Sequence, residues 1–128
     1  MERTDFTDSD RKNNERMTEK IIQNGYAIHK LDESGNNHCV DGPAVIWPGG
    51  TNEWWLNGKR HRVDGPAYEA EEYKAWYLNG LLHREDGPAI EEYHQKTWWL
   101  NGRCLGETRP ENWEELILLA QVERVMND

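Results

Sequence analysis

The heptapeptide His61-Arg62-Val63-Asp64-Gly65-Pro66-Ala67 occurs in three versions, and these decide the fold. The other two are His38-Cys39-Val40-Asp41-Gly42-Pro43-Ala44 and His83-Arg84-Glu85-Asp86-Gly87-Pro88-Ala89. A second shared segment follows each version: Trp54-Trp55-Leu56-Asn57-Gly58, Trp76-Tyr77-Leu78-Asn79-Gly80 and Trp98-Trp99-Leu100-Asn101-Gly102. An offset of about 23 and then about 22 residues is typical of repeat proteins, in which no unit buries its apolar face alone. This period favours a binding surface over a single buried catalytic pocket.

Each repeat predicts one β-hairpin. Asp-Gly-Pro-Ala reverses the chain, because glycine accepts positive φ and proline fixes its own φ. A short strand follows in each repeat: Val45-Ile46-Trp47, Tyr68-Glu69-Ala70 and Ile90-Glu91-Glu92. The return strand carries the tryptophans and ends at Asn-Gly, the strongest short signal for a type I′ turn. We therefore predict a mostly β protein, an antiparallel meander of hairpin repeats in a single curved sheet.

The repeats also set the boundaries along the chain. The repeat array is expected at 21–106, with units at about 38–60, 61–82 and 83–104 and a degenerate leading unit at 24–37. Residues 1–20 are polar, lack clear apolar spacing and are expected to form a flexible arm. Residues 107–128 are expected to be a C-terminal helix that caps the array.

The helix prediction rests on its start and its apolar face. Thr108-Arg109-Pro110-Glu111 has the pattern of a capping box with proline in the first turn. Four apolar side chains share one face and three more widen it: Trp113, Leu116, Ile117 and Ala120, then Leu119, Val122 and Met126. So broad an apolar surface must be buried. The helix either shields the last repeat or packs against a partner, including a second copy in a homodimer.

Composition narrows the class of protein. With 128 residues, one domain is expected, and the 7 Trp and 5 Tyr concentrate the apolar surface in large rings. A net charge of -9 has the wrong sign for a binder of nucleic-acid backbones. No apolar run spans a membrane or forms a signal peptide, and the sparse cysteines indicate a reducing compartment, so we expect a cytoplasmic protein. Cys39 and Cys104 lie in different repeats without zinc-site spacing, so neither a metal nor a cofactor is expected.

A histidine and an aspartate three residues apart recur in every repeat: His38 and Asp41, His61 and Asp64, His83 and Asp86. Such a pair has the composition of a catalytic base with its orienting carboxylate. A catalytic constellation is needed only once, however, and no Ser or Cys nucleophile recurs beside the pairs. We therefore expect all six residues to make hydrogen bonds of the turns, and we expect no enzymatic activity.

The aromatic positions are the candidate binding surface. Alternation along a strand places three tryptophans with the leucines on one face and the remaining rings on the other: Trp54, Trp76 and Trp98, against Trp55, Tyr77 and Trp99. Three repeats cannot cover both faces of a thin sheet, so one face needs another cover or stays open for a ligand. Together with Arg62 and Arg84, these rings are typical of protein-interaction hot spots and of base-stacking platforms.

A hairpin of about 23 residues with aromatic strand positions and an Asn-Gly turn resembles the MORN repeat family in its broad sense. The His-x-x-Asp-Gly-Pro-Ala and Trp-Trp/Tyr-Leu-Asn-Gly segments resemble the repeats frequent in tailed bacteriophages, some bacteria and giant viruses. The resemblance covers residues 38–104, with a weaker fringe from residue 24. It implies a scaffold or interaction surface and fixes neither an activity nor a ligand.

Two functions from different classes follow. The first is a non-enzymatic interaction protein that binds another protein through its repeat surface. The resemblance further implies that the chain is a phage-type accessory protein that modulates a host protein and acts against host defence. The alternative is a module that binds or sequesters a small nucleotide between the Trp or Tyr faces and an arginine.

Overall fold

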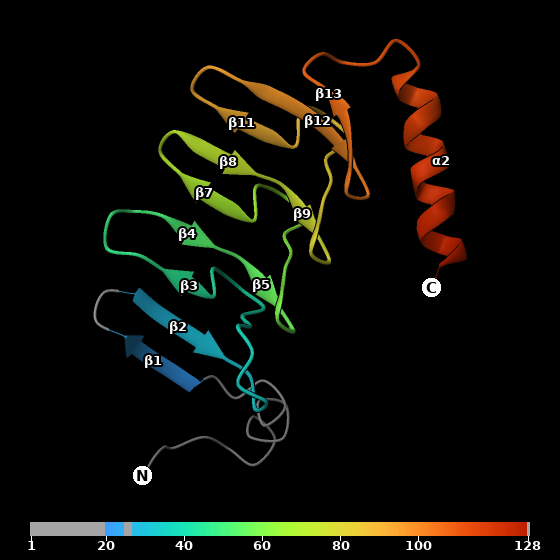
Figure 1. The fold of residues 1–128 in the computed structure, drawn as a ribbon. Helices are drawn as coiled ribbons and strands as arrows, with labels where there is room; N and C mark the ends of the chain where they lie inside the picture. Colours follow the sequence, from blue (N-terminus) through green and yellow to red (C-terminus); the bar gives the residue numbers. More distant parts are fainter. Residues whose placement is uncertain (1–19, 25–26, 128) are drawn as a thin grey trace.

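The structure, a computed structural model, describes residues 20–24 and 27–127. Nine strands form one antiparallel sheet in the order β1-β2-β3-β4-β7-β8-β11-β12-β13. Two short hairpins lie outside this sheet, and one helix, α2, follows it (Figure 1). The predicted fold class, a mostly β antiparallel array with a C-terminal helix, is confirmed. The arm expected at 1–20 lies outside the described residues, apart from Lys20 at the start of β1.

The elements are short and follow the chain in order. The main sheet contains β1 (Lys20–Asn24), β2 (Ala27–Leu31), β3 (Val45–Ile46), β4 (Asn52–Glu53), β7 (Tyr68–Ala70), β8 (Tyr73–Ala75), β11 (Ile90–Glu92), β12 (Lys96–Leu100) and β13 (Arg103–Gly106). The separate hairpins are β5 (Trp55–Leu56) with β6 (Lys59–Arg60), and β9 (Tyr77–Leu78) with β10 (Leu81–Leu82). The helix α2 spans Trp113–Met126. Each repeat thus gives two strands to the sheet, as the hairpin prediction requires.

In the first two repeats, the return strand is interrupted at its first tryptophan. Trp54 separates β4 from β5, and Trp76 separates β8 from β9. At the first bend, the N–H of Trp54 donates to the carbonyl of Ala67 in the next repeat at 2.7 Å. Only β12 of the third repeat runs through, with a register shift between Trp98 and Trp99. The bends let the Asn-Gly hairpins leave the main sheet.

The Asn-Gly turns have the predicted conformation. Asn57, Asn79 and Asn101 have φ of 53°, 50° and 48°, and each following glycine has φ between 79° and 83°. Two consecutive residues with positive φ define a type I′ turn, whose twist matches that of the flanking strands. The left-handed conformation is the reason that asparagine recurs here.

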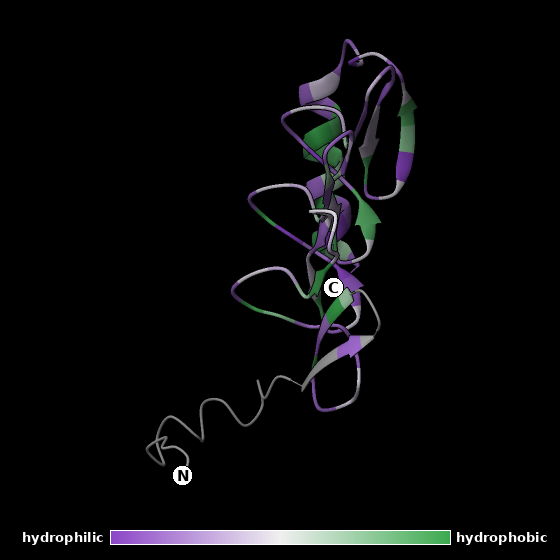
Figure 2. Ribbon diagram, turned by 90° about the vertical axis from the view of Figure 1, so that its left-hand side faces the viewer, coloured by the Kyte–Doolittle hydropathy of each residue, from purple (hydrophilic) through white to green (hydrophobic). Residues whose placement is uncertain are grey.

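The buried core is a thin strip of small side chains. Ala44, Ala67, Ala75 and Ala89 have no exposed surface, and Val45 is the largest side chain less than 2% exposed. Seen from the side, the strands form a thin layer from which connections loop out (Figure 2). The six repeated rings of the return strands are half-buried and form the walls of the array rather than a central core.

The prediction that the helix covers the last repeat is confirmed. Trp113 and Ala120 are buried together with Leu100 of β12, and Leu116 and Ile117 pack against this cluster. The capping box was wrong, because α2 begins at Trp113 and its N-cap Asn112 makes no side-chain hydrogen bond. The helix starts where the first apolar side chain meets the sheet, and packing overrides the local pattern.

The apolar helix face predicted from the sequence is wider than the part that the sheet covers. Leu119, Val122 and Met126 are 60%, 53% and 78% exposed, and Leu118 and Val125 are exposed beside them. The sheet covers only the side of α2 that carries Trp113 and Ala120, since a thin array offers a single contact surface. The opposite side therefore presents an apolar stripe to solvent.

Replacing Asn79 with alanine should lower the free energy of unfolding by about 1–2 kcal/mol, because alanine lacks the ease of asparagine in the left-handed region. Asn79→Gly is the matched control and should be close to neutral, since glycine adopts this conformation freely. Urea unfolding followed by tryptophan fluorescence measures both. Equal midpoints for the alanine and glycine variants would contradict the assignment of strain to this turn.

Candidate functional site

Three loops built by the heptapeptides project beside the sheet: loop A (residues 39–43), loop B (62–66) and loop C (84–88). Two open grooves separate them. Groove 1 lies between loops A and B, contains Trp54 and Leu56 in its lining and has a volume of about 700 Å³. Groove 2 lies between loops B and C, contains Trp76 and Leu78 and has a volume of about 730 Å³. The two grooves are the same site in consecutive repeats.

An arginine joins loop B, and another joins loop C, to the preceding tryptophan, whereas loop A has Cys39 at this position. The guanidinium carbon of Arg62 lies 3.7 Å from the ring centroid of Trp54, and Arg62 also donates to the carbonyl of Pro66 at 3.0 Å. It forms ion pairs with Asp64 and Glu69. A planar guanidinium suits this combination of stacking and hydrogen bonds.

Arg84 repeats this arrangement one unit later. Its guanidinium carbon lies 3.8 Å from the Trp76 ring, and it contacts the Pro88 carbonyl, Asp86 and Glu91. The two arginines predicted for the binding surface thus have their charges balanced by carboxylates of their own repeats. They serve to hold the groove walls together.

The three histidines fasten the Asn-Gly turns. Nδ1 of His38, His61 and His83 accepts a hydrogen bond at 2.9 Å from the backbone N–H of Asn57, Asn79 and Asn101, respectively. An acceptor at Nδ1 requires the proton of a neutral ring to be on Nε2. Each loop is thereby tied to the turn at the far end of its own hairpin.

The three aspartates bind elsewhere. Asp41 accepts from the thiol of Cys39, and Asp64 and Asp86 hold Arg62 and Arg84. Among the hydrogen bonds of the described residues, none joins a repeat histidine to the aspartate three residues later. The structure therefore places the six residues in two separate networks and does not assemble a His-Asp pair.

Burial and neighbouring charges set the histidine titration. Burial lowers the pKa of His61. Burial also lowers the pKa of His83, aided by Arg124 and opposed by the hydrogen bond to Glu85. Burial acts to raise the pKa of Glu85, but hydrogen bonds from His83 and Gln121 outweigh it and lower that pKa. Both shifts favour a neutral histidine beside an ionised glutamate.

Two rings on the other face of the return strands, Trp55 and Tyr77, lie beside a cluster of hydrogen bonds around Glu53. The repeat pattern does not predict this cluster. Buried Glu53 accepts hydrogen bonds from the indoles of Trp47 and Trp55 and from Arg60, at 2.8, 3.0 and 3.1 Å. The Arg60 guanidinium also lies 5.5 Å from the Tyr77 ring. Because Glu53 and Arg60 do not recur in the other repeats, only the folded chain brings them together.

Trp99, Trp55 and Tyr77 are all half-buried. The indole of Trp99 donates to the hydroxyl of Thr97 at 2.8 Å. Both aromatic ladders are therefore partly covered, and neither forms a bare strip of rings. The open surface consists of the grooves beside Trp54 and Trp76.

The third equivalent groove is filled by α2. Trp98 and Leu100 occupy the positions of Trp76 and Leu78, but Trp113 packs edge-on against Trp98 at 5.0 Å between ring centroids. Leu100 is 5% exposed, whereas Leu56 and Leu78 are half-buried. The same surface is thus closed in the last repeat and open in the first two.

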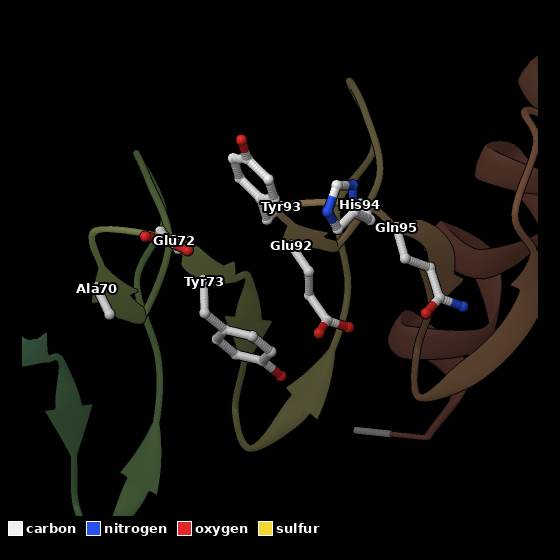
Figure 3. A pocket seen from close by; sticks show the side chains of 7 residues that line it. All are labelled: Ala70, Glu72, Tyr73, Glu92, Tyr93, His94 and Gln95. Carbon is white, nitrogen blue, oxygen red and sulfur yellow. The ribbon is translucent and has the colours of Figure 1, made fainter.

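A smaller pocket lies at the opposite turns of two hairpins, with a volume of about 440 Å³ (Figure 3). Its lining includes Tyr73, Glu92, Tyr93 and His94, and the last two rings pack at 4.4 Å. Burial raises the pKa of Tyr73, with further effects of Tyr77 and Glu92 in the same direction. The turn sequences differ between repeats, so this pocket is not a periodic site.

Within the described parts of the chain, no three His, Cys, Asp or Glu side chains come together in a way that could hold a metal ion. Over the same residues, no helix has the length and apolar character needed to cross a membrane.

No protein-family model matches the chain, and neither the curated proteins nor the solved structures contain a significant match. The resemblance to MORN-type repeats therefore remains a prediction from the motifs.

Replacing Arg84 with lysine should lower the free energy of unfolding by about 1–3 kcal/mol, because an ammonium cannot stack on Trp76 and reach three acceptors together. The matched control is Arg109→Lys, whose exposed pair with Glu114 should change stability by less than about 0.5 kcal/mol. Urea midpoints compare the two. If Arg84→Lys has the same urea midpoint as the wild-type protein, Arg84 does not stabilise the contact between loop C and Trp76.

Acidification from about pH 7.5 to about pH 5.5 should lower the melting temperature. The pKa values of His61 and His83 in the folded protein lie below that of an unfolded histidine, near 6.5, so the unfolded chain binds more protons in this range. The contribution of the two histidines to the free energy of unfolding is complete above their pKa in the unfolded chain. It is lost as the pH falls through their pKa in the folded protein. A double variant, His61→Asn with His83→Asn, should show a flatter dependence, and an unchanged slope would assign the effect to other groups.

Proposed function

We propose that this protein is a non-enzymatic interaction module that binds another protein through grooves 1 and 2. The observation that carries the proposal is the difference between equivalent repeats. One groove is closed by an amphipathic helix of the chain itself, and two grooves of the same construction are open. A surface that already buries a helix in one repeat has the shape and chemistry for a protein segment in the others.

The groove walls support binding of apolar side chains. Val40 and Val63 at the tips of loops A and B are 60% and 81% exposed, and they line the grooves beside half-buried Trp and Leu side chains. Aromatic and aliphatic groups in a concave surface, with charged residues at its rim, are characteristic of interaction hot spots. The first two repeats therefore form one continuous candidate interface.

The nucleotide alternative is less well supported by the arginines. Arg62 and Arg84 each cover a tryptophan ring and bind two carboxylates. A phosphate would have to displace these partners from a protein whose net charge is -9. A protein ligand uses the same grooves without breaking these contacts.

The cellular setting of the proposal comes from the resemblance of the motifs. It suggests a host protein as the partner, a phage-type accessory protein as the binder and a role against host defence. The cytoplasm as the location comes from the sparse cysteines and the lack of a signal peptide in the sequence. The net negative charge of the protein fits this setting. An acidic surface repels nucleic acids and attracts a partner with basic residues.

Substituting the loop tips tests the proposal. Val40→Glu and Val63→Glu together should weaken binding of a captured partner by at least about tenfold, because both changes place a charge beside the Trp and Leu side chains of the grooves. Both valines are exposed, so the fold should be preserved, which a melting curve checks. Leu119→Glu on the outer side of α2 and Tyr93→Glu in the smaller pocket are controls. Binding lost only in a control variant would place the interface elsewhere.

A further inference from the structure

The contact between α2 and the third repeat shows which kind of segment this groove accepts. By the repeat register, Glu85, Trp98 and Leu100 correspond to Val63, Trp76 and Leu78 in groove 2. The corresponding residues of groove 1 are Val40, Trp54 and Leu56. The chain thus contains one filled and two unfilled versions of one site.

The helix fills its site with side chains at helical spacing. Trp113, Leu116, Ile117 and Ala120 lie on the side of α2 that faces Leu100. In addition, the indole N–H of Trp113 donates to the main-chain carbonyl of Glu85 at 2.8 Å. The contact therefore combines an apolar helix face with one directed hydrogen bond to the loop backbone.

The open grooves offer the same groups. Among the described residues, none donates a hydrogen bond to the carbonyl of Val40 or Val63, the equivalents of the Glu85 carbonyl. Loop C differs in its side chain, since Glu85 binds Gln121 and Arg124 of α2. Valine at this position replaces those polar contacts with apolar surface. Groove 1 has a valine on both sides, whereas groove 2 has Val63 on one side and Glu85 with Arg124 of α2 on the other. A ligand for either groove therefore needs an indole and aliphatic groups, and in groove 2 it also lies beside Arg124.

The end of α2 leaves room for such a ligand. A further hollow of about 400 Å³ is lined by Asn127, Arg124 and Glu123 of the helix end and by Leu78, Asn79 and Leu81 of the second repeat. In Figure 1, α2 lies beside the last repeat, and its C-terminal end lies near the second repeat. Among the described residues, no other helix covers the first two repeats. The surface on which α2 rests thus continues past its C-terminus.

The rim of the grooves carries more acidic than basic groups, because Arg62 and Arg84 each pair with two carboxylates. The side chains of Asp64 and Asp86 are 88% and 86% exposed, and Asp41 is exposed at the equivalent place in loop A. With a net charge of -9, the protein favours basic residues at the edges of a ligand. A second copy of this chain would bring its own acidic surface to the same rim, so a basic partner is favoured.

We propose that grooves 1 and 2 bind an amphipathic helix of the partner protein. This helix presents a tryptophan and aliphatic side chains on one face, donates its indole N–H to the carbonyl of Val40 or Val63, and carries Lys or Arg beside that face. The inference rests on the proposed function and adds the chemistry of the ligand.

A synthetic peptide of residues 107–127 is the probe, added with a fluorescent label to the full-length protein. It should bind measurably, and the peptide Trp113→Ala should bind at least about tenfold more weakly. A peptide with Glu114→Lys and Glu115→Lys, both exposed in α2, should bind more tightly because it is basic. Val63→Glu in the protein should weaken binding of the unchanged peptide, whereas Leu119→Glu should not.

Several results would overturn the inference. If Val40→Glu and Val63→Glu leave peptide binding unchanged, the peptide has only exchanged with α2 at the third repeat. If the lysine peptide binds more weakly, the basic flank is wrong. If no peptide binds while a captured partner still depends on both valines, the ligand is not such a helix, although the proposed function stands. If a captured partner ignores both valines, the proposed function itself fails.

Discussion

The covering of one tryptophan ring per repeat is the constraint on which this structure depends. A hairpin of this size cannot bury the indole at its bend, so the next segment of the chain must do so. Arg62 covers Trp54 and Arg84 covers Trp76 through stacked guanidinium groups. The next unit has no such arginine, since Gly106 stands at the equivalent position. Trp113 of α2 packs against Trp98 instead, and the array ends there.

This constraint explains why the protein is held together by neighbour contacts. The fully buried side chains are mainly alanines, whose small volume lets adjacent strands and loops come close. Stability comes instead from contacts that recur with the repeat: a histidine on each Asn-Gly turn, and an arginine on each of the first two bend tryptophans. A thin array with large half-buried rings gains more from such directed contacts than from a deep core. The histidines are used at Nδ1 by the backbone, which argues for a structural task in all three repeats.

The same constraint leaves the first two grooves open. An arginine covers its tryptophan with a flat group that lies close to its own loop, and space remains between neighbouring loops. A helix covers the third tryptophan with a bulky face, and no comparable space remains. The binding surface that we propose is therefore a consequence of how the rings are covered. The helix α2 ends the array, and it is the pattern for the ligand that we propose. The exposed apolar stripe on the far side of α2 follows from the same geometry, because a thin sheet contacts a helix on one side only.

Much of the fold follows from the sequence by itself. The triplicated motifs determined the hairpins, the Asn-Gly turns and the antiparallel order, because turn chemistry and strand alternation act over a few residues. Helical spacing, which is equally local, placed Trp113 and Ala120 on one apolar face, and the structure decided that this face packs against the last repeat. Only the tertiary structure decided where α2 begins, which part of its apolar surface stays exposed, and that Arg62 and Arg84 stack on the preceding tryptophans. The cluster of hydrogen bonds around Glu53 was likewise decided there. These features depend on distances between segments that are far apart in the chain, and such distances are fixed by packing rather than by any local pattern of residues.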